Sequence, residues 1–250
     1  MSEAIDNMDM IMDMPRSVDS PRDERLAMPR AALFDLDGTL IDSVPDITAA
    51  VAELLAAEKL PPLSEDQVRL MVGRGLKVLV RRVYDAQGMA LDEASLECRL
   101  DDMREVYARH LVGRTTLMPG VTAALDFLRT RGCTMAVVTN KLVDATETIL
   151  RHFGLRGYFD VVIGDSTEPP LSLLARKPQP DMLLEAMRRL GTTADATVMI
   201  GDSGVDIRSA RAAGVRAVAV RGGYSAEPLE SFAPDALLGS LADIPVSFKA

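Results

Sequence analysis

Carboxylate and hydroxyl side chains come directly after three apolar runs of the chain. Asp35 and Asp37 follow the first run, Thr139 follows the second, and Asp202 and Asp206 follow a later one. Carboxylates that are held close together repel one another unless a cation lies among them. Magnesium prefers a few carboxylate oxygens together with water and substrate phosphate, so this set of residues predicts a Mg²⁺ site.

The same residues suit phosphoryl transfer. A cation and the side chain of Lys177 would neutralise the charge of a phosphate, so that a carboxylate could attack phosphorus and form an aspartyl-phosphate. A second carboxyl group two positions along the chain could protonate the leaving alcohol and later activate water. Thr139 and nearby backbone N–H groups would hold the transferring oxygens.

These side chains meet only if the apolar runs are strands of one parallel sheet, because ligands bind beyond the carboxyl ends of such strands. Runs typical of buried strands occur at Ala31–Phe34, Cys133–Val138, Phe159–Ile163, Thr197–Ile200 and Val215–Val220. Helical patterns occur at Val121–Arg131, Thr146–His152, Pro180–Arg189 and Ile207–Ala213, and Gly132, Gly154, Gly191 and Gly214 close them. The alternation predicts an α/β fold with a doubly wound parallel sheet.

One long interval breaks this alternation. No strand candidate occurs between Asp42 and Met118, where helical patterns cover 47–58, 77–87 and 93–112. We therefore expect an inserted, small α-helical cap domain at residues 45–117. The α/β core would consist of residues 30–44 and 118–250.

Residues 1–29 differ in composition from the rest of the chain. They hold six of the 14 methionines, and seven acidic residues against three arginines. Such a segment, without sustained periodicity, predicts a disordered, acidic, methionine-rich tail. An alternative is that translation begins at Met28, directly before the first strand.

The overall composition excludes several classes of protein. The 250 residues are 48% hydrophobic and 26% charged, as in an ordinary globular protein. The net charge of −9 disfavours nucleic acids and anionic membrane surfaces as partners. There is no apolar run of membrane-spanning length and no secretory signal pattern, so we expect a cytoplasmic protein. We expect a monomer or a homodimer, and the sequence does not distinguish the two.

Cysteine and histidine are scarce. Cys98 and Cys133 show no CxxC spacing, so we expect free thiols that are buried as small apolar groups. The only histidines, His110 and His152, are too few for a multi-histidine zinc site.

Four motifs, in this order, resemble those of the haloacid dehalogenase-like hydrolases. They are Asp35-Leu36-Asp37-Gly38-Thr39, Thr139, Lys177 and Gly201-Asp202-Ser203-Gly204-Val205-Asp206. The resemblance spans residues 31–243 and implies that family's Rossmann-like core with a cap domain. It implies that Asp35 is the nucleophile, Asp37 the acid/base, and Thr139 and Lys177 the phosphate-binding residues.

The resemblance also implies a ligand set for Mg²⁺. Asp35 and Asp202 would bind the metal, Asp206 would support its water shell, and Asp37 would contribute its backbone carbonyl. Gly38, Thr39 and Asn140 stand in the same motifs and are expected to contact the substrate.

Asp37 favours the phosphatase branch, because the dehalogenase and phosphonatase branches do not keep this aspartate. The strings FDLDGTLIDS (34–43), AVVTNK (136–141) and KPQPD (177–181) resemble bacterial phosphoglycolate phosphatases of carbohydrate metabolism. The implied substrate is a small phosphorylated metabolite, 2-phosphoglycolate. Arg74 or Lys77, in the turn and helix start of the cap, is expected to meet its carboxylate.

Two departures from the family pattern affect the third motif. Gln179 takes the place of a usual histidine, and the loop 165–175 ahead of Lys177 is longer than expected. Two other functions stay open at this point. A sugar-phosphate phosphatase or phosphomutase would share the core residues and differ in the cap. A non-catalytic binding protein would be expected to lack Asp35 or Asp37, and both are present.

Overall fold

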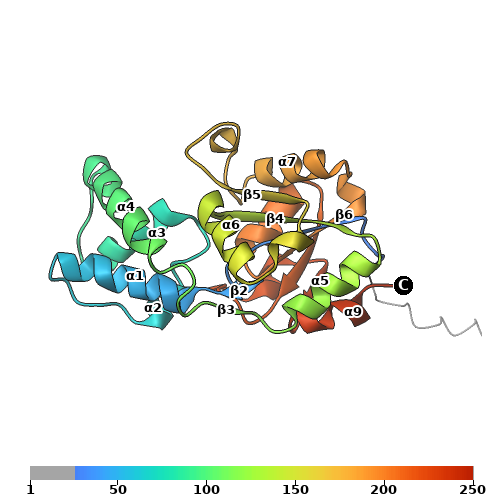
Figure 1. Ribbon diagram of the computed structural model, residues 1–250, viewed down its shortest axis with the longest axis horizontal. Coiled ribbons are helices and arrows are strands. Elements are labelled where there is room, and N and C mark those ends of the chain that lie inside the picture. Colours follow the sequence, from blue (N-terminus) through green and yellow to red (C-terminus); the bar gives the residue numbers. More distant parts are fainter. Residues whose placement is uncertain (1–25, 250) are drawn as a thin grey trace, which may run out of the picture.

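The computed structural model describes residues 26–249, and a six-stranded sheet forms the centre of the molecule (Figure 1). The strand order is β5-β4-β1-β6-β7-β8, and every neighbouring pair is parallel. The strands are β1 (Ala31–Phe34), β4 (Thr134–Leu142), β5 (Val161–Asp165), β6 (Thr197–Gly201), β7 (Arg216–Val220) and β8 (Ala236–Leu238). Since the chain continues from β1 to one side and later returns to the other, the carboxyl ends of β1, β4 and β6 form one crevice.

Helices cover both faces of this sheet, which confirms the predicted doubly wound α/β fold. One face packs against α5 (Val121–Thr130), α6 (Val143–His152) and α9 (Ile244–Ser247). The other face packs against α7 (Asp181–Leu190) and α8 (Gly204–Ala212). Side chains alternate along β1, so that Phe34 belongs to the first layer and Leu33 to the second.

The strand predictions fail where an element is short or polar. The expectation of no strand between Asp42 and Met118 was wrong, because β3 (Thr116–Leu117) pairs antiparallel with β2 (Ile41–Asp42). Two residues are too few to show a periodicity. The second predicted strand ended at Val138, whereas β4 continues through polar residues to Leu142.

The four glycines that were predicted to close helices all have positive φ, between 63° and 72°. They are Gly132, Gly154, Gly191 and Gly214.

Four helices form a separate body beside the core (Figure 1). They are α1 (Val44–Ala57), α2 (Glu65–Arg69), α3 (Leu76–Ala86) and α4 (Glu93–Ala108), and they share a hydrophobic cluster of their own. The small β2–β3 sheet lies where the chain leaves and re-enters the core. Asp46 ties these two passages together, since it accepts hydrogen bonds from the backbone N–H groups of Arg114 and Thr115, each at 2.8 Å.

The folded core begins earlier than the predicted boundary at residue 30. Leu26 N–H donates to the Ser247 carbonyl, and Lys249 N–H donates to the Leu26 carbonyl, both at 2.8 Å. Leu26 and Met28 pack against the core. Two apolar residues are too short a pattern to mark this contact in the sequence. The tail was predicted for residues 1–29, and its residues 1–25 lie outside the described residues.

Two further observations concern single residues and the membrane. Both cysteines are free thiols, as expected, but Cys98 is exposed on α4 and only Cys133 is buried. Burial of Cys98 was therefore a wrong prediction, because its position falls on the outer side of an amphipathic helix. Within residues 26–249, no helix combines the length and the apolar character that crossing a membrane requires.

Candidate active site

The crevice at the carboxyl ends of β1, β4 and β6 brings the predicted core residues together. Asp35 directly follows β1, Thr139 lies in β4, and Asp202 directly follows β6. Asp206 lies in the first turn of α8, and Lys177 comes from the loop before α7. All five side chains belong to buried residues. An ionisable cluster of this kind inside a protein is stable only if its charges are paired.

Lys177 pairs with two of the carboxylates. Its Nζ lies 2.9 Å from Oδ1 of Asp35 and 2.7 Å from Oδ1 of Asp206. The loop that carries Lys177 is held by Asn140, whose side chain accepts from Lys177 N–H at 3.0 Å and donates to the Lys177 carbonyl at 2.9 Å. The Asn140 amide also donates to the Gly73 carbonyl of the cap at 3.1 Å. Asn140 was predicted to contact the substrate, and these hydrogen bonds show that it also positions Lys177.

A metal ion fits among three of the carboxylates. Oxygens of Asp35, Asp202 and Asp206 lie within 4.8 Å of one another. Asp202 is fixed by Thr39 Oγ1 at 2.9 Å and by Tyr224 N–H at 2.7 Å. Thr39, which was expected on the substrate, thus uses its hydroxyl to orient a candidate metal ligand. A set of carboxylate oxygens suits a hard cation such as Mg²⁺.

Glycine is required at the point where the first motif approaches Asp202. Gly38 has a φ of +87°, and a Cβ atom there would lie 2.4 Å from Oδ2 of Asp202. Any other residue would be strained in this conformation and would displace the carboxylate. Gly38 therefore allows the segments after β1 and β6 to lie in close contact.

The crowding of carboxylates shifts their pKa values. Burial raises the pKa of Asp35 to about 6, although the charge of Lys177 acts in the opposite direction. Burial, together with Asp206 and Asp35, raises the pKa of Asp202. Burial opposes the charge of Lys177, but Asp206 and Asp35 outweigh it and raise the pKa of the lysine. The cluster holds more negative charge than one lysine neutralises. A bound cation would reduce the remaining repulsion among the carboxylates.

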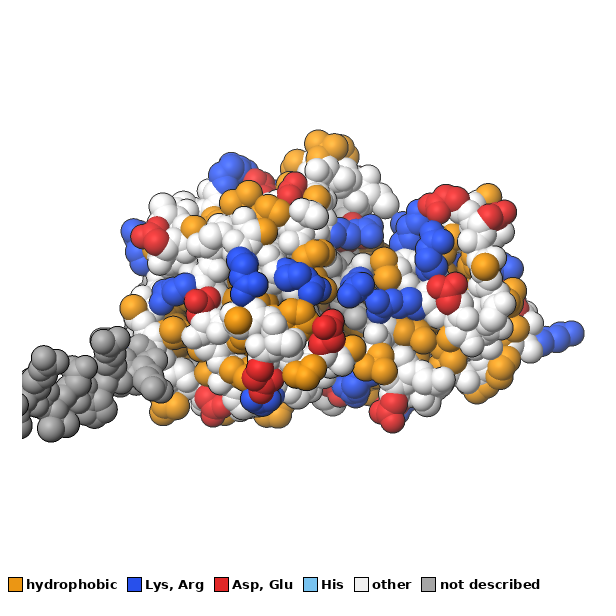
Figure 2. Space-filling view, turned by 180° about the vertical axis from the view of Figure 1, so that it is seen from behind, with side chains coloured by type: hydrophobic (Ala, Val, Ile, Leu, Met, Phe, Trp, Pro, Cys, Tyr) orange, Lys and Arg blue, Asp and Glu red, His pale blue; other side chains and the backbone are white. Residues whose placement is uncertain are grey.

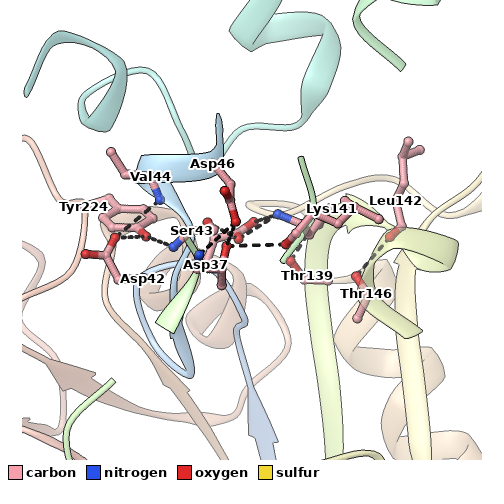
Figure 3. Close-up of polar contacts among 12 residues, drawn as sticks. Asp37, Asp42, Ser43, Val44, Asp46, Thr139, Lys141, Leu142, Thr146 and Tyr224 are labelled. Carbon is pink, nitrogen blue, oxygen red and sulfur yellow. Dashed lines mark hydrogen bonds and ion pairs between the residues drawn. The ribbon is translucent and has the colours of Figure 1, made fainter. Parts of the chain in front are cut away.

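The Asp37 carboxylate points toward Lys141 and Ser43 (Figure 3). Lys141 Nζ lies 2.8 Å from Oδ1 and 3.1 Å from Oδ2 of Asp37, and Ser43 Oγ donates to Oδ1 at 2.6 Å. The predicted contribution of Asp37 to the metal site therefore rests on its backbone carbonyl. Lys141 was not among the predicted site residues. The sequence could have indicated Lys141, because it comes two residues after Thr139 at the end of a buried strand.

A family model confirms the origin of these motifs. The model described as haloacid dehalogenase-like hydrolase matches residues 32–220. The chain belongs to the haloacid dehalogenase-like hydrolases. It is 39% identical to a phosphoglycolate phosphatase of Caulobacter vibrioides, over 85% of this chain and 87% of that protein. It is 37% identical to one of Rhodospirillum rubrum, over 87% of this chain and 90% of that protein.

Solved structures of the family agree with this fold. A predicted phosphoglycolate phosphatase from Haemophilus somnus superposes with a TM-score of 0.80 at 29% identity, covering 88% of this chain and 97% of that one. CbbY from Rhodobacter sphaeroides in complex with phosphate gives a TM-score of 0.71 at 27% identity, covering 87% and 96%. The prediction of a phosphoric monoester hydrolase with this core is confirmed.

Two pockets of the hydrolase adjoin Asp35 and Asp37. One lies under the cap and is lined by Lys141 and by apolar cap side chains. The other is lined by Arg74 and Arg82 of the cap and Arg208 of α8. Figure 2 shows Lys and Arg side chains gathered where the cap meets the core.

The structure places the two predicted cap residues differently. Arg74 lines the second pocket. Lys77 lines neither pocket, and its ammonium group pairs with Glu93 and Glu97 of α4. Of the two, Arg74 is the one that lies beside the active site.

The two departures from the family pattern lie outside these pockets. Gln179 is exposed, and its backbone carbonyl accepts from Ser209 Oγ at 2.8 Å. The loop 165–175 projects beside α7 (Figure 1), and Asp165 at its start pairs with Arg176 at its end at 2.7 Å.

Proposed function

We propose that this enzyme hydrolyses 2-phosphoglycolate to glycolate and phosphate, with Mg²⁺, through an aspartyl-phosphate on Asp35. The observation that carries the proposal is that Asp35 pairs with Lys177 and shares one carboxylate cluster with Asp202 and Asp206. Curated relatives that cover most of the chain are named phosphoglycolate phosphatase.

The chemistry divides into two displacements at phosphorus. The Asp35 carboxylate attacks, so that a bond forms between its oxygen and phosphorus while the bond to the glycolate oxygen breaks. Asp37 donates a proton to that oxygen, and then accepts one from the water that cleaves the aspartyl-phosphate. Lys177, Thr139 and backbone N–H groups of the first motif hold the phosphate oxygens during both steps.

The metal ligands in this proposal are the side chains of Asp35, Asp202 and Asp206 and the backbone carbonyl of Asp37. When bound, Mg²⁺ would neutralise phosphate charge and polarise phosphorus toward attack. The three carboxylates already lie close enough to share one cation. Gly38 and Thr39 would act near the phosphate through their backbone, because the Thr39 hydroxyl is engaged with Asp202.

The proposed substrate is a free small metabolite. The net charge of −9 disfavours nucleic acids and anionic membrane surfaces as partners. We further propose that the enzyme acts in the cytoplasm as a monomer or a homodimer. A contact of the substrate carboxylate with Arg74 or Lys77 is the prediction from the sequence, and the lining of the second pocket favours Arg74 as that alternative.

The test is phosphate release from a panel of small phosphomonoesters, with Mg²⁺ or with chelator. We expect strong preference for 2-phosphoglycolate over glucose 6-phosphate and β-glucose 1-phosphate, with activity lost in chelator. Preference for a sugar phosphate would contradict the substrate and support the alternative phosphatase or phosphomutase. CbbY, at 27% identity, has been crystallised as a variant with xylulose 1,5-bisphosphate, so bisphosphates belong in the panel.

A further inference from the structure

Lys141 is a buried lysine at the active site that the mechanism above does not use. Its side chain is 6% exposed, and the carboxylate of Asp37 is its ion-pair partner. A buried charge at this place calls for a function beyond packing, because burying an ion is costly.

The pocket in front of Lys141 is otherwise apolar where the cap covers it. The apolar cap residues that line it are Ile47, Val72, Leu76, Leu79 and Met103. Lys141 is the one cation among the described residues that line this pocket. The cavity volume is about 50 Å³, which is room for only a few water-sized groups.

Tyr107 of the cap adds a second polar atom to the same pocket. Its ring lies over Lys141, with Nζ 4.9 Å from the ring centre. Among residues 26–249, no hydrogen bond of normal geometry satisfies its buried hydroxyl, although the Lys141 ammonium group acts on it. Burial raises the pKa of Tyr107 to about 12, so the hydroxyl keeps a proton to donate. An unsatisfied buried hydroxyl is costly, and a ligand oxygen in the pocket would satisfy it.

We infer that Lys141 and Tyr107 form the subsite that recognises the carboxylate of the leaving group, an inference that rests on the proposed function. Asp37 must touch the ester oxygen to protonate it, and Lys141 Nζ lies 2.8 Å from that aspartate. The carboxyl carbon of phosphoglycolate is two bonds from the ester oxygen. A carboxylate there comes within reach of the ammonium group and of the tyrosine hydroxyl.

This assignment differs from one in which a cap cation reads the carboxylate. Arg74 is exposed and lines the other pocket, which Asp202 and Tyr224 also line. Lys141 belongs to the core strand β4, next to the phosphate-binding Thr139. The cap then contributes an apolar cover and the Tyr107 hydroxyl, so the subsite is complete only when the cap lies against the core.

The test compares two substrates that differ in one group. In 2-hydroxyethyl phosphate, a hydroxymethyl group replaces the carboxylate of 2-phosphoglycolate. We expect Lys141→Met to reduce the ratio of kcat/KM for phosphoglycolate over hydroxyethyl phosphate by about 30-fold or more, because the substrate carboxylate loses its buried cationic partner. A general loss of activity, through Asp37 or through misfolding, cancels in this ratio. Lys141→Arg is expected to restore part of it.

Three further variants sharpen the comparison. Tyr107→Phe is expected to lower the same ratio by about fivefold, the effect of one neutral hydrogen bond. Lys59→Met, which removes a surface charge of the cap, is the control and should leave the ratio within twofold of the wild type. A ratio unchanged in Lys141→Met, or collapsed in Arg74→Ala instead, overturns the assignment.

The wild-type ratio tests the proposed function separately. A wild-type enzyme that does not prefer phosphoglycolate over hydroxyethyl phosphate disproves that function, and the subsite falls with it. A strong wild-type preference that survives Lys141→Met disproves the subsite alone.

Discussion

Asp35 is expected to affect both catalysis and the stability of the fold, and one substitution can separate the two effects. Its carboxylate is the proposed nucleophile, and burial raises its pKa to about 6. Because the pKa of Asp35 is higher in the folded state than its usual value of 3.8, the free energy of unfolding decreases as the pH rises from about 3.8 to about 6. At pH 7 the charged Asp35 therefore costs folding free energy when no cation is bound.

We expect Asp35→Asn to lower kcat by at least about 10³-fold without lowering the melting temperature in chelator. The amide keeps the shape of the side chain and removes the charge. Calorimetry in chelator, together with phosphate release in Mg²⁺, measures the two effects. A melting temperature several degrees below that of the wild type would show that the Lys177 pair stabilises the site more than crowding destabilises it.

The two cysteines differ in environment, and thiol reagents report this difference. Cys98 is exposed, whereas burial raises the pKa of Cys133 to about 12. Because the thiolate is the reactive form, Cys133 is almost entirely unreactive at pH 8. We expect one fast equivalent in an Ellman titration of the native protein and two in guanidinium chloride. Two fast equivalents from the native protein would contradict the burial of Cys133.

At the scale of elements, the junction between core and cap depends on Asp46. This buried carboxylate sits in the first turn of α1 and binds the segment that returns to β3. It accepts from Arg114 N–H, Thr115 N–H and the Thr115 hydroxyl, the last at 2.7 Å. An amide in its place would turn an NH₂ group toward these donors.

We expect Asp46→Asn to lower the free energy of unfolding by about 1–3 kcal/mol, since buried donors lose their acceptor. Urea denaturation measures it as a lower midpoint. Asp85→Asn, on the exposed side of α3, is the matched control and should change stability by less than about 0.5 kcal/mol. Equal effects in the two variants would mean that Asp46 does not hold the junction.

Sequence patterns located the long elements of this fold and missed those whose pairing is decided by distant residues. The strands β1, β4, β5, β6 and β7 are buried apolar runs, which periodicity detects. In contrast, β8 has three residues and β2 two, so only their partners define them as strands.

The same distinction applies to the site. Asp35, Lys177 and Asp202 could be predicted because their motif order implies one crevice. Lys141 was missed, because only the folded chain shows that its ammonium group turns to Asp37 under the Tyr107 ring.

At the scale of the whole molecule, contacts across the cleft join the cap to the site. The Asn140 side chain donates to the Gly73 carbonyl, and Arg69 of the cap lies 3.6 Å from Asp42 and over the Tyr224 ring. Tyr224 N–H in turn holds Asp202. A movement of the cap would therefore change the surroundings of both the Lys177 loop and the candidate metal ligands.

Metal binding is expected to stabilise the whole protein, because the carboxylate cluster exists only in the folded state. A ligand at about 100 times its dissociation constant adds about 2.7 kcal/mol, or several degrees in melting temperature for a chain of this size. We expect the melting temperature to rise with MgCl₂ and not with NaCl of equal ionic strength.

Asp202→Asn identifies the site of this effect. Burial and the neighbouring carboxylates raise the pKa of Asp202, so its charge is unfavourable when no cation is present. The variant is therefore expected to melt at or above the wild-type temperature in chelator, yet to show no rise with MgCl₂. A wild-type-like rise in the variant would place the cation elsewhere. A variant that melts well below the wild type in chelator would show that the hydrogen bonds from Thr39 and Tyr224 outweigh the repulsion among the carboxylates.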